Sequence, residues 1–164
     1  MTKKQSDKIE MLLTTLPECQ RDIYQKVSEY AVELGYSPSI VKNAHGRFIS
    51  LAFSKKGKRL IKINPPGIYS DEMEFLMQFY AAAEYSDFFH EKVRQNYERT
   101  GASCKCNCEK CVGKYTYIYP DGREAIRCAI HSLIELSPIE TAQVNEVKTL
   151  MKLQDDFWME RTMP

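Results

Sequence analysis

Four cysteines lie within eight positions of the chain, and a fifth follows some way behind them. The group is Cys104, Cys106, Cys108 and Cys111, and Cys128 comes 17 residues after the last of these. Cys108 and Cys111 have the Cys-x-x-Cys spacing of a zinc knuckle, which holds two thiolates on one side of a turn. A returning thiolate then completes a tetrahedral site. The sequence therefore predicts a structural Zn²⁺ ion bound by Cys106, Cys108, Cys111 and Cys128.

The fourth ligand is the open part of this prediction, since Cys104 or His131 can take the place of Cys106. Five unligated thiols and an iron–sulfur cluster are the alternatives to zinc. In reducing compartments, clustered cysteines are more often metal ligands than disulfides. A site closed by four protein ligands leaves no coordination position for a substrate. The predicted metal therefore stabilises the fold and does not catalyse.

The segment between the cysteines reads as a β-hairpin. It runs from Tyr115 to Arg127, with a turn at Pro120-Asp121-Gly122. Tyr115, Tyr117 and Tyr119 alternate along the first strand and share one face. Two interpretations of this face remain open: a surface that stacks bases or contacts a protein partner, or the side of the hairpin that packs on the rest of the domain.

The remaining residues that could carry chemistry form no recognisable catalytic motif. His45 and His90 are scattered, and Cys19 is predicted to be an unligated thiol. Asp155 and Asp156 are adjacent, so on a helix they point apart, and we expect a solvated face. A non-enzymatic binding or accessory protein is the predicted function. A small-molecule enzyme or sensor with a pocket between sheet and helices, and a thiol- or metal-responsive regulator, are the alternatives.

Composition bounds the class of protein. The 164 residues are 43% hydrophobic and 27% charged, which is typical of one globular domain. No apolar core of a signal peptide follows the basic N-terminus. No apolar run approaches the roughly 20 residues that a membrane span needs. We therefore expect a cytoplasmic protein without a membrane partner.

The net charge of +1 is unevenly spread along the chain. Residues 1–64 carry 12 Lys and Arg against 6 Asp and Glu, whereas residues 65–101 carry 3 against 7. A dedicated nucleic-acid-binding protein usually shows a stronger basic excess. The sequence predicts no sequence-specific nucleic-acid binding, and at most a weak association that is lost near physiological salt.

Two helices are predicted at the N-terminus. The first is capped by Ser6, and its apolar stripe ends at Leu16. The second begins at a capping box formed by Thr15 and Glu18 and ends at Gly35, a glycine suited to a left-handed stop.

Period-two patterns predict strands over residues 47–54 and 59–64, joined by a turn at residues 55–58. Residues 73–81 fit either a strand or a helix. We expect a third strand there, because two strands alone make a poor sheet.

Two further helices are predicted on either side of the cysteine-bearing hairpin. A helix follows Ser86, carries Phe89, Val93 and Tyr97 inward, and ends at Gly101. A short strand is expected within residues 132–136. Ser137-Pro138-Ile139-Glu140 has the spacing of a helix cap, and the final helix runs to about residue 160 with Trp158 as a core anchor.

The predicted fold class is α+β: an antiparallel sheet with N-terminal helices, a metal-clasped hairpin of the zinc-ribbon kind and a C-terminal helix. The predicted units are an α+β core over residues 1–101, the cysteine-clasped hairpin over 102–136, and a closing helix over 137–164 of the same domain.

Six segments of the chain carry a resemblance to known proteins: Leu16-Pro17, Glu29–Tyr36, Leu51–Lys56, Glu84–Phe89, Cys108–Cys111 and Tyr115–Arg123. They resemble uncharacterised small Firmicutes-type proteins with a cysteine cluster, and the first part of the chain is remotely similar to YdhG-like domains of unknown function. The resemblance implies a bacterial protein and brings no established activity. The chain departs from it after Cys128, where Ala129-Ile130 replace Gly-Gly, and in its extra cysteines before Cys108, which bears on the role of Cys104.

Overall fold

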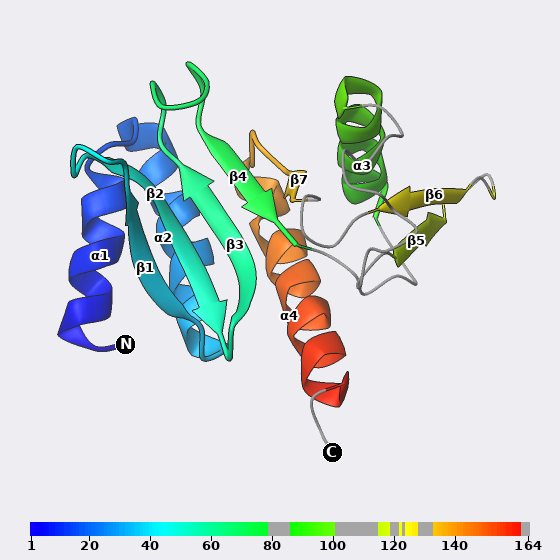
Figure 1. Ribbon diagram of the computed structural model, residues 1–164, viewed down its shortest axis with the longest axis horizontal. Coiled ribbons are helices and arrows are strands. Elements are labelled where there is room, and N and C mark those ends of the chain that lie inside the picture. Colours follow the sequence, from blue (N-terminus) through cyan, green and yellow to red (C-terminus); the bar gives the residue numbers. More distant parts are fainter. Residues whose placement is uncertain (79–85, 101–114, 119–121, 123, 128–132, 162–164) are drawn as a thin grey trace.

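The computed structural model describes residues 1–78, 86–100, 115–118, 122, 124–127 and 133–161. Within these residues the chain forms four α-helices, one short 3₁₀ helix and seven strands, five of which make an antiparallel sheet. The fold class is α+β, as predicted. Figure 1 shows α2 (Glu18–Glu33) and α4 (Val144–Arg161) behind the sheet, and α1 (Lys3–Leu13) beside its first strand.

Both N-terminal helices begin at residues other than the predicted caps. Thr2, not Ser6, caps α1, because the Thr2 hydroxyl accepts a backbone N–H from the first turn of the helix. The predicted capping box at Thr15 is wrong as well. The Thr15 hydroxyl donates to the carbonyl of Leu12 over 2.6 Å, and Pro17 is the residue that precedes α2.

Gly35 ends α2, as predicted. Its φ of +88° lies in the left-handed region that favours glycine. The N–H groups of Gly35 and Tyr36 donate to the carbonyls of Val32 and Ala31 over 2.9 and 3.0 Å. This pair of bonds is the Schellman arrangement, and it leads the chain directly into the first strand.

The five-stranded sheet has the order β1-β2-β3-β4-β7, with every neighbouring pair antiparallel. β2, β3 and β4 are the predicted strands, so the described part of residues 73–81 is a strand and not a helix. β7 is the short strand expected within residues 132–136. The bounds are β1 (Ser37–Lys42), β2 (Phe48–Lys55), β3 (Lys58–Asn64), β4 (Glu74–Met77) and β7 (Ile134–Glu135).

The predicted sheet of three strands is too small, because β1 and β7 extend it at both edges. Pro38 makes residues 37–42 look like a loop, since proline has no N–H to donate to a ladder. On an edge strand one side of the ladder is unpaired, and proline is tolerated there. The Lys8 ammonium donates to the Pro38 carbonyl over 2.7 Å, which occupies one backbone group of the edge.

The turn between β2 and β3 is the predicted one. Lys55 pairs with Lys58, so the loop consists of Lys56 and Gly57, whose φ values are +49° and +76°. Positive φ at both positions defines the type I′ turn, whose twist matches that of a hairpin.

The helix that follows the main strands begins where it was predicted. α3 (Asp87–Thr100) begins after Ser86 as predicted, with the Ser86 hydroxyl accepting the N–H of Phe89. The side chain of Tyr97 and residue Gly101 lie outside the described residues.

The predicted cap at Ser137 is wrong. The Ser137 hydroxyl accepts the N–H of Phe75 over 3.2 Å and donates to the carboxylate of Glu135 over 3.1 Å, so it is engaged with the sheet. Glu140 instead caps the 3₁₀ helix η2 (Thr141–Gln143), which leads into α4.

The hydrophobic core lies between the sheet and the helices. One face of the sheet contributes Leu51, Phe53, Ile61, Ile63, Phe75 and Met77, and none of these six is exposed. Trp158, the predicted anchor, is 4% exposed and belongs to the same core. The buried residues before and in the helices belong to the same core, and they include Ile9, Leu12, Leu13, Leu16, Ile23, Val27, Ala31, Phe89, Val93, Val144, Val147, Leu150 and Met151.

Candidate functional site

The hairpin predicted between the cysteines is present. β5 (Tyr115–Ile118) and β6 (Glu124–Arg127) form a separate two-stranded antiparallel sheet in which Tyr115 lies opposite Arg127. Gly122, in the predicted turn, has a φ of +82°, which glycine adopts without steric cost. The register therefore brings Tyr115 and Arg127 together at the open end of the hairpin.

The candidate metal ligands lie outside the described residues. They are Cys104, Cys106, Cys108, Cys111, Cys128 and His131. Within the residues that the structure describes, no group of three or more His, Cys, Asp or Glu side chains could hold a metal ion. The zinc site stays a prediction, and so do both interpretations of the tyrosine face, whose side chains are also outside the described set.

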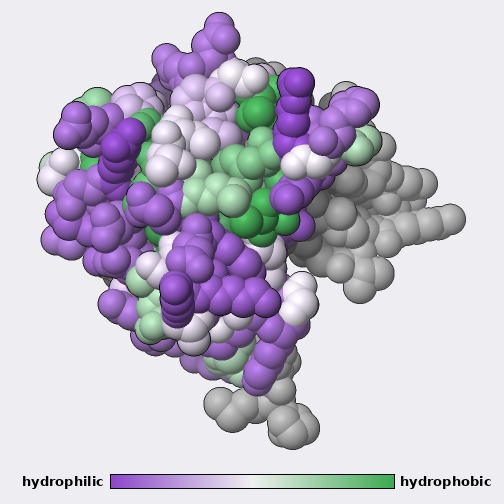
Figure 2. Space-filling model, turned by 90° about the vertical axis from the view of Figure 1, so that its left-hand side faces the viewer, coloured by the Kyte–Doolittle hydropathy of each residue, from purple (hydrophilic) through white to green (hydrophobic). Residues whose placement is uncertain are grey.

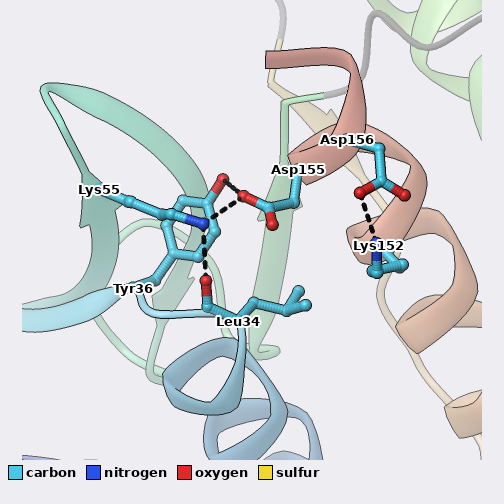
Figure 3. Close-up of polar contacts among 6 residues, drawn as sticks. All are labelled: Leu34, Tyr36, Lys55, Lys152, Asp155 and Asp156. Carbon is cyan, nitrogen blue, oxygen red and sulfur yellow. Dashed lines mark hydrogen bonds and ion pairs between the residues drawn. The ribbon is translucent and has the colours of Figure 1, made fainter. Parts of the chain in front are cut away.

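Three titratable side chains meet in the interior of the described part of the chain (Figure 3). The Tyr36 hydroxyl donates to Oδ1 of Asp155 over 3.0 Å, and Lys55 Nζ donates to the same oxygen over 2.8 Å. Lys55 Nζ also donates to the carbonyl of Leu34 over 2.8 Å and lies 5.3 Å from the centre of the Tyr36 ring. We call Tyr36, Lys55 and Asp155 the interior cluster.

The members of the interior cluster come from three separate parts of the chain. Tyr36 stands between the end of α2 and the start of β1, Lys55 is the last residue of β2, and Asp155 lies in α4. The carbonyl of Leu34 is at the C-terminal end of α2, where carbonyls lack helical partners and attract cations. The turn at Gly35 therefore sets where one acceptor of Lys55, the Leu34 carbonyl, lies.

The electrostatics of the interior cluster keep its hydroxyl protonated. Burial, reinforced by the hydrogen bond to Asp155 and by its charge, raises the pKa of Tyr36 far above its ordinary value. The side chains of Lys55 and Asp155 are 21% and 9% exposed, so their charges are mostly removed from water. A buried ion pair is tolerated when further hydrogen bonds satisfy it, and Tyr36 and Leu34 supply these bonds.

The interior cluster is suited to joining elements, not to reacting with a substrate. Tyr36 has no exposed surface, and its ring packs 6.4 Å from that of Trp158. A general acid or base must come within hydrogen-bond reach of the substrate, which this enclosure prevents for the tyrosine. The cluster connects α2, β1, β2 and α4.

The prediction of a solvated pair at Asp155 and Asp156 is wrong for Asp155. The two side chains do point apart, as expected for neighbours on a helix. Asp156 forms an exposed ion pair with Lys152, whereas Asp155 turns into the interior (Figure 3). The signal was present: Asp155 follows Met151 by four residues and precedes Trp158 by three, so it falls on the buried stripe of α4.

His45 lies as expected, in a turn before a strand, whereas Cys19, expected to be buried or half-exposed, is exposed. His45 is exposed in a turn, where its N–H donates to Oδ1 of Asn43 over 2.9 Å. Cys19 is a free, exposed thiol in the first turn of α2.

Comparisons with protein-family models, with curated proteins and with solved structures give no match to this chain. In the described residues, no helix has the length and apolar character needed to cross a membrane.

Figure 2 shows the side of the molecule on which α1 and β1 lie. The described surface on this side is mostly hydrophilic, with a hydrophobic area near the middle.

Proposed function

We propose that this protein is a non-enzymatic binding or accessory protein whose cysteine-bearing hairpin is held by a structural Zn²⁺ ion. Cys106, Cys108, Cys111 and Cys128 are the ligands, with Cys104 or His131 as the substitute for Cys106. The observation that supports the proposal is the register of β5 and β6.

The register of β5 and β6 allows Cys111 and Cys128, the two proposed ligands that flank the hairpin, to reach the same metal ion. Cys128 directly follows Arg127, which lies opposite Tyr115. Cys111 precedes Tyr115 by four residues, a stretch of chain that spans at most about 14 Å. Both thiolates can therefore lie within the roughly 2.3 Å that a zinc–sulfur bond requires of a common ion.

The charges in this part of the sequence suit a thiolate site. Four thiolates on one Zn²⁺ leave a net charge of −2, which nearby cations offset. Lys105, Lys110, Lys114 and Arg127 are close in sequence to the proposed ligands. They favour the deprotonated thiols that zinc needs.

Coordination of the Zn²⁺ ion by four protein ligands favours a role in binding a partner over a role in catalysis. Four protein ligands fill a tetrahedral site, so the ion has no position for a substrate or an activated water molecule. The hairpin is then a rigid unit that presents its strands to a partner. A protein partner is the one that the tyrosine face suits best.

Serine substitutions of the cysteines test the proposal. Cys111→Ser and Cys128→Ser are expected to lose zinc and to lower the melting temperature sharply, because metal-linked folding contributes on the order of several kcal/mol. Cys19→Ser is the matched control, since its thiol is exposed and unligated. Zinc content and thermal unfolding are the measurements, and Cys104→Ser and Cys106→Ser identify the fourth ligand. Full zinc content in Cys111→Ser, with the melting temperature of the control, would contradict the proposal.

A further inference from the structure

One face of β2 and β3 points away from the core and carries basic and hydroxyl side chains. The register places Ala52 opposite Lys62 and Ser54 opposite Arg59. The pairing shifts by one residue between Phe53 and Ser54, and both Leu60 and Ile61 are buried at this shift. The shift lets Arg59 and Lys62, three positions apart, share the face opposite to Phe53. Ala52 on that face is 2% exposed, whereas Arg59 is exposed. In Figure 1 the two strands lie in front of α2 and α4, and no described helix covers this face.

Arg59 and Lys62 concentrate positive charge on this face. Burial, together with the nearby Arg59 charge, lowers the pKa of Lys62. Glu74 is the acidic group that acts on Lys62, and its carboxylate is also bonded to the Asn64 amide over 2.6 Å. Among the described residues, neither Arg59 nor Lys62 forms an ion pair with a carboxylate. Two like charges held close together attract an anionic ligand.

An exposed aromatic ring adjoins these charges. Tyr69, in the loop between β3 and β4, is 60% exposed, and Lys62 Nζ lies 5.1 Å from its ring centre. The neighbouring Ile68 is 39% exposed. A ring that is open to solvent beside a cation offers a stacking surface for a planar group, and nucleobases stack on such rings whatever their sequence.

We propose that the face formed by Arg59, Lys62 and Tyr69 binds single-stranded nucleic acid without sequence preference. Phosphates lie against the two basic side chains, and one unpaired base stacks on Tyr69. A duplex keeps its bases stacked inside and cannot use the ring, and a simple polyanion uses only the charges. The net charge of +1 does not exclude such a face, because residues 1–64 carry 12 Lys and Arg against 6 Asp and Glu. The inference does not depend on the zinc site.

Fluorescence anisotropy with a labelled 15-nucleotide oligothymidine tests this proposal, at salt concentrations from 50 to 200 mM. Arg59→Gln and Lys62→Gln are expected to weaken binding and to reduce the slope of log Kd against log salt by about 0.7 each, one phosphate contact apiece. Tyr69→Ala is expected to weaken binding about tenfold with the slope unchanged, because stacking releases no counterions. Lys26→Gln is the charge-matched control, since Lys26 is exposed on α2, where it pairs with Asp22.

Circular dichroism of each variant establishes that it is folded. Absence of binding to the wild-type protein at 50 mM salt would overturn the proposal. So would an equal loss of binding in Lys26→Gln and Lys62→Gln. If the protein bound a DNA duplex or a heparin fragment as tightly as the oligothymidine, and if Tyr69→Ala bound as tightly as the wild type, the proposal would be wrong. The face would then bind polyanions through charge alone.

Discussion

Asp155 and Asp156 are neighbours in the sequence, yet they lie in different surroundings. Asp156 meets Lys152 at the surface, where both side chains are about half exposed. Asp155 accepts hydrogen bonds from Tyr36 and Lys55 in the interior. Water screens the attraction between Asp156 and Lys152, and the loss of side-chain entropy opposes their pairing. The attraction between Asp155 and Lys55 is only weakly screened, because both side chains are mostly buried.

Asparagine substitutions at the two positions form a matched pair. Asp155→Asn leaves the Lys55 charge enclosed without a counterion, and we expect a loss of about 2 to 4 kcal/mol in the free energy of unfolding. Asp156→Asn removes only a surface ion pair and should cost less than about 1 kcal/mol. Urea unfolding of both variants measures the difference. Equal losses would show that the interior cluster does not hold these elements together.

Tyr36 gives a prediction for alkaline pH. The folded protein keeps its hydroxyl protonated, whereas an unfolded tyrosine loses its proton near pH 10. Above pH 10 the unfolded chain binds fewer protons, so the stability that Tyr36 contributes is present below that pH and is lost above it. The loss is about 1.4 kcal/mol per pH unit for each such tyrosine.

The variant Tyr36→Phe removes one of these groups. Tyr24, whose pKa burial also raises, remains in the variant and provides a constant background. Unfolding free energies from pH 9 to pH 11 should therefore fall less steeply in Tyr36→Phe than in the wild type. Parallel pH profiles for the two proteins would contradict the account of the Tyr36 proton.

At the scale of elements, the C-terminal end of α2 determines how helix and sheet join. The Schellman bonds after Ala31 and Val32 close the helix, and Gly35 then turns the chain so that Tyr36 enters the core. The same turn leaves the Leu34 carbonyl as an acceptor for Lys55. Gly35 thus sets the direction in which the chain enters β1, and with it the positions of Tyr36 and of the Leu34 carbonyl that accepts from Lys55.

Substitution of Gly35 separates backbone strain from packing. A Cβ at this position would lie 3.6 Å from the Lys55 side chain, which is ordinary contact, so the cost comes from the positive φ. Gly35→Ala should therefore lose about 1 to 2 kcal/mol. Gly35→Asn should lose less, because asparagine tolerates the left-handed region. Thermal unfolding compares the two, and a greater loss in the asparagine variant would count against this explanation.

The elements that the sequence predicts well are those with a repeating pattern of burial. The stripes of α2 and α4 and the alternation in β2 and β3 follow from which residues avoid water, and that information is local. Helix caps are less predictable, because several hydroxyls compete and tertiary contacts decide. Ser137, for example, bonds to Phe75 of β4 and not to the following helix.

The interior cluster could not be predicted from local patterns. Lys55 and Asp155 are 100 residues apart, and only the completed sheet and α4 bring them together. Pro38 obscured β1 for a similar reason, since its tolerance depends on the strand being at an edge. The grouping of Arg59, Lys62 and Tyr69 likewise depends on the register and on a loop.

At the scale of the whole molecule, the chain combines a helix-covered sheet with a small hairpin that has its own strands. β7 pairs with β4, so the chain returns from the hairpin region into the main sheet before α4 closes the core. A two-stranded hairpin alone is marginally stable in water. A metal clasp at its open end would supply the missing stability, which connects the predicted cysteine site to the fold as a whole.

Zinc analysis of the purified protein, combined with a count of reactive thiols, tests the central proposal most directly. The chain has six cysteines, of which four are proposed ligands. We predict about one zinc ion per chain and two thiols that react rapidly in the native protein, with the other four reacting only after a chelator removes the metal. A protein without zinc, in which all six thiols react at once, would contradict the proposal.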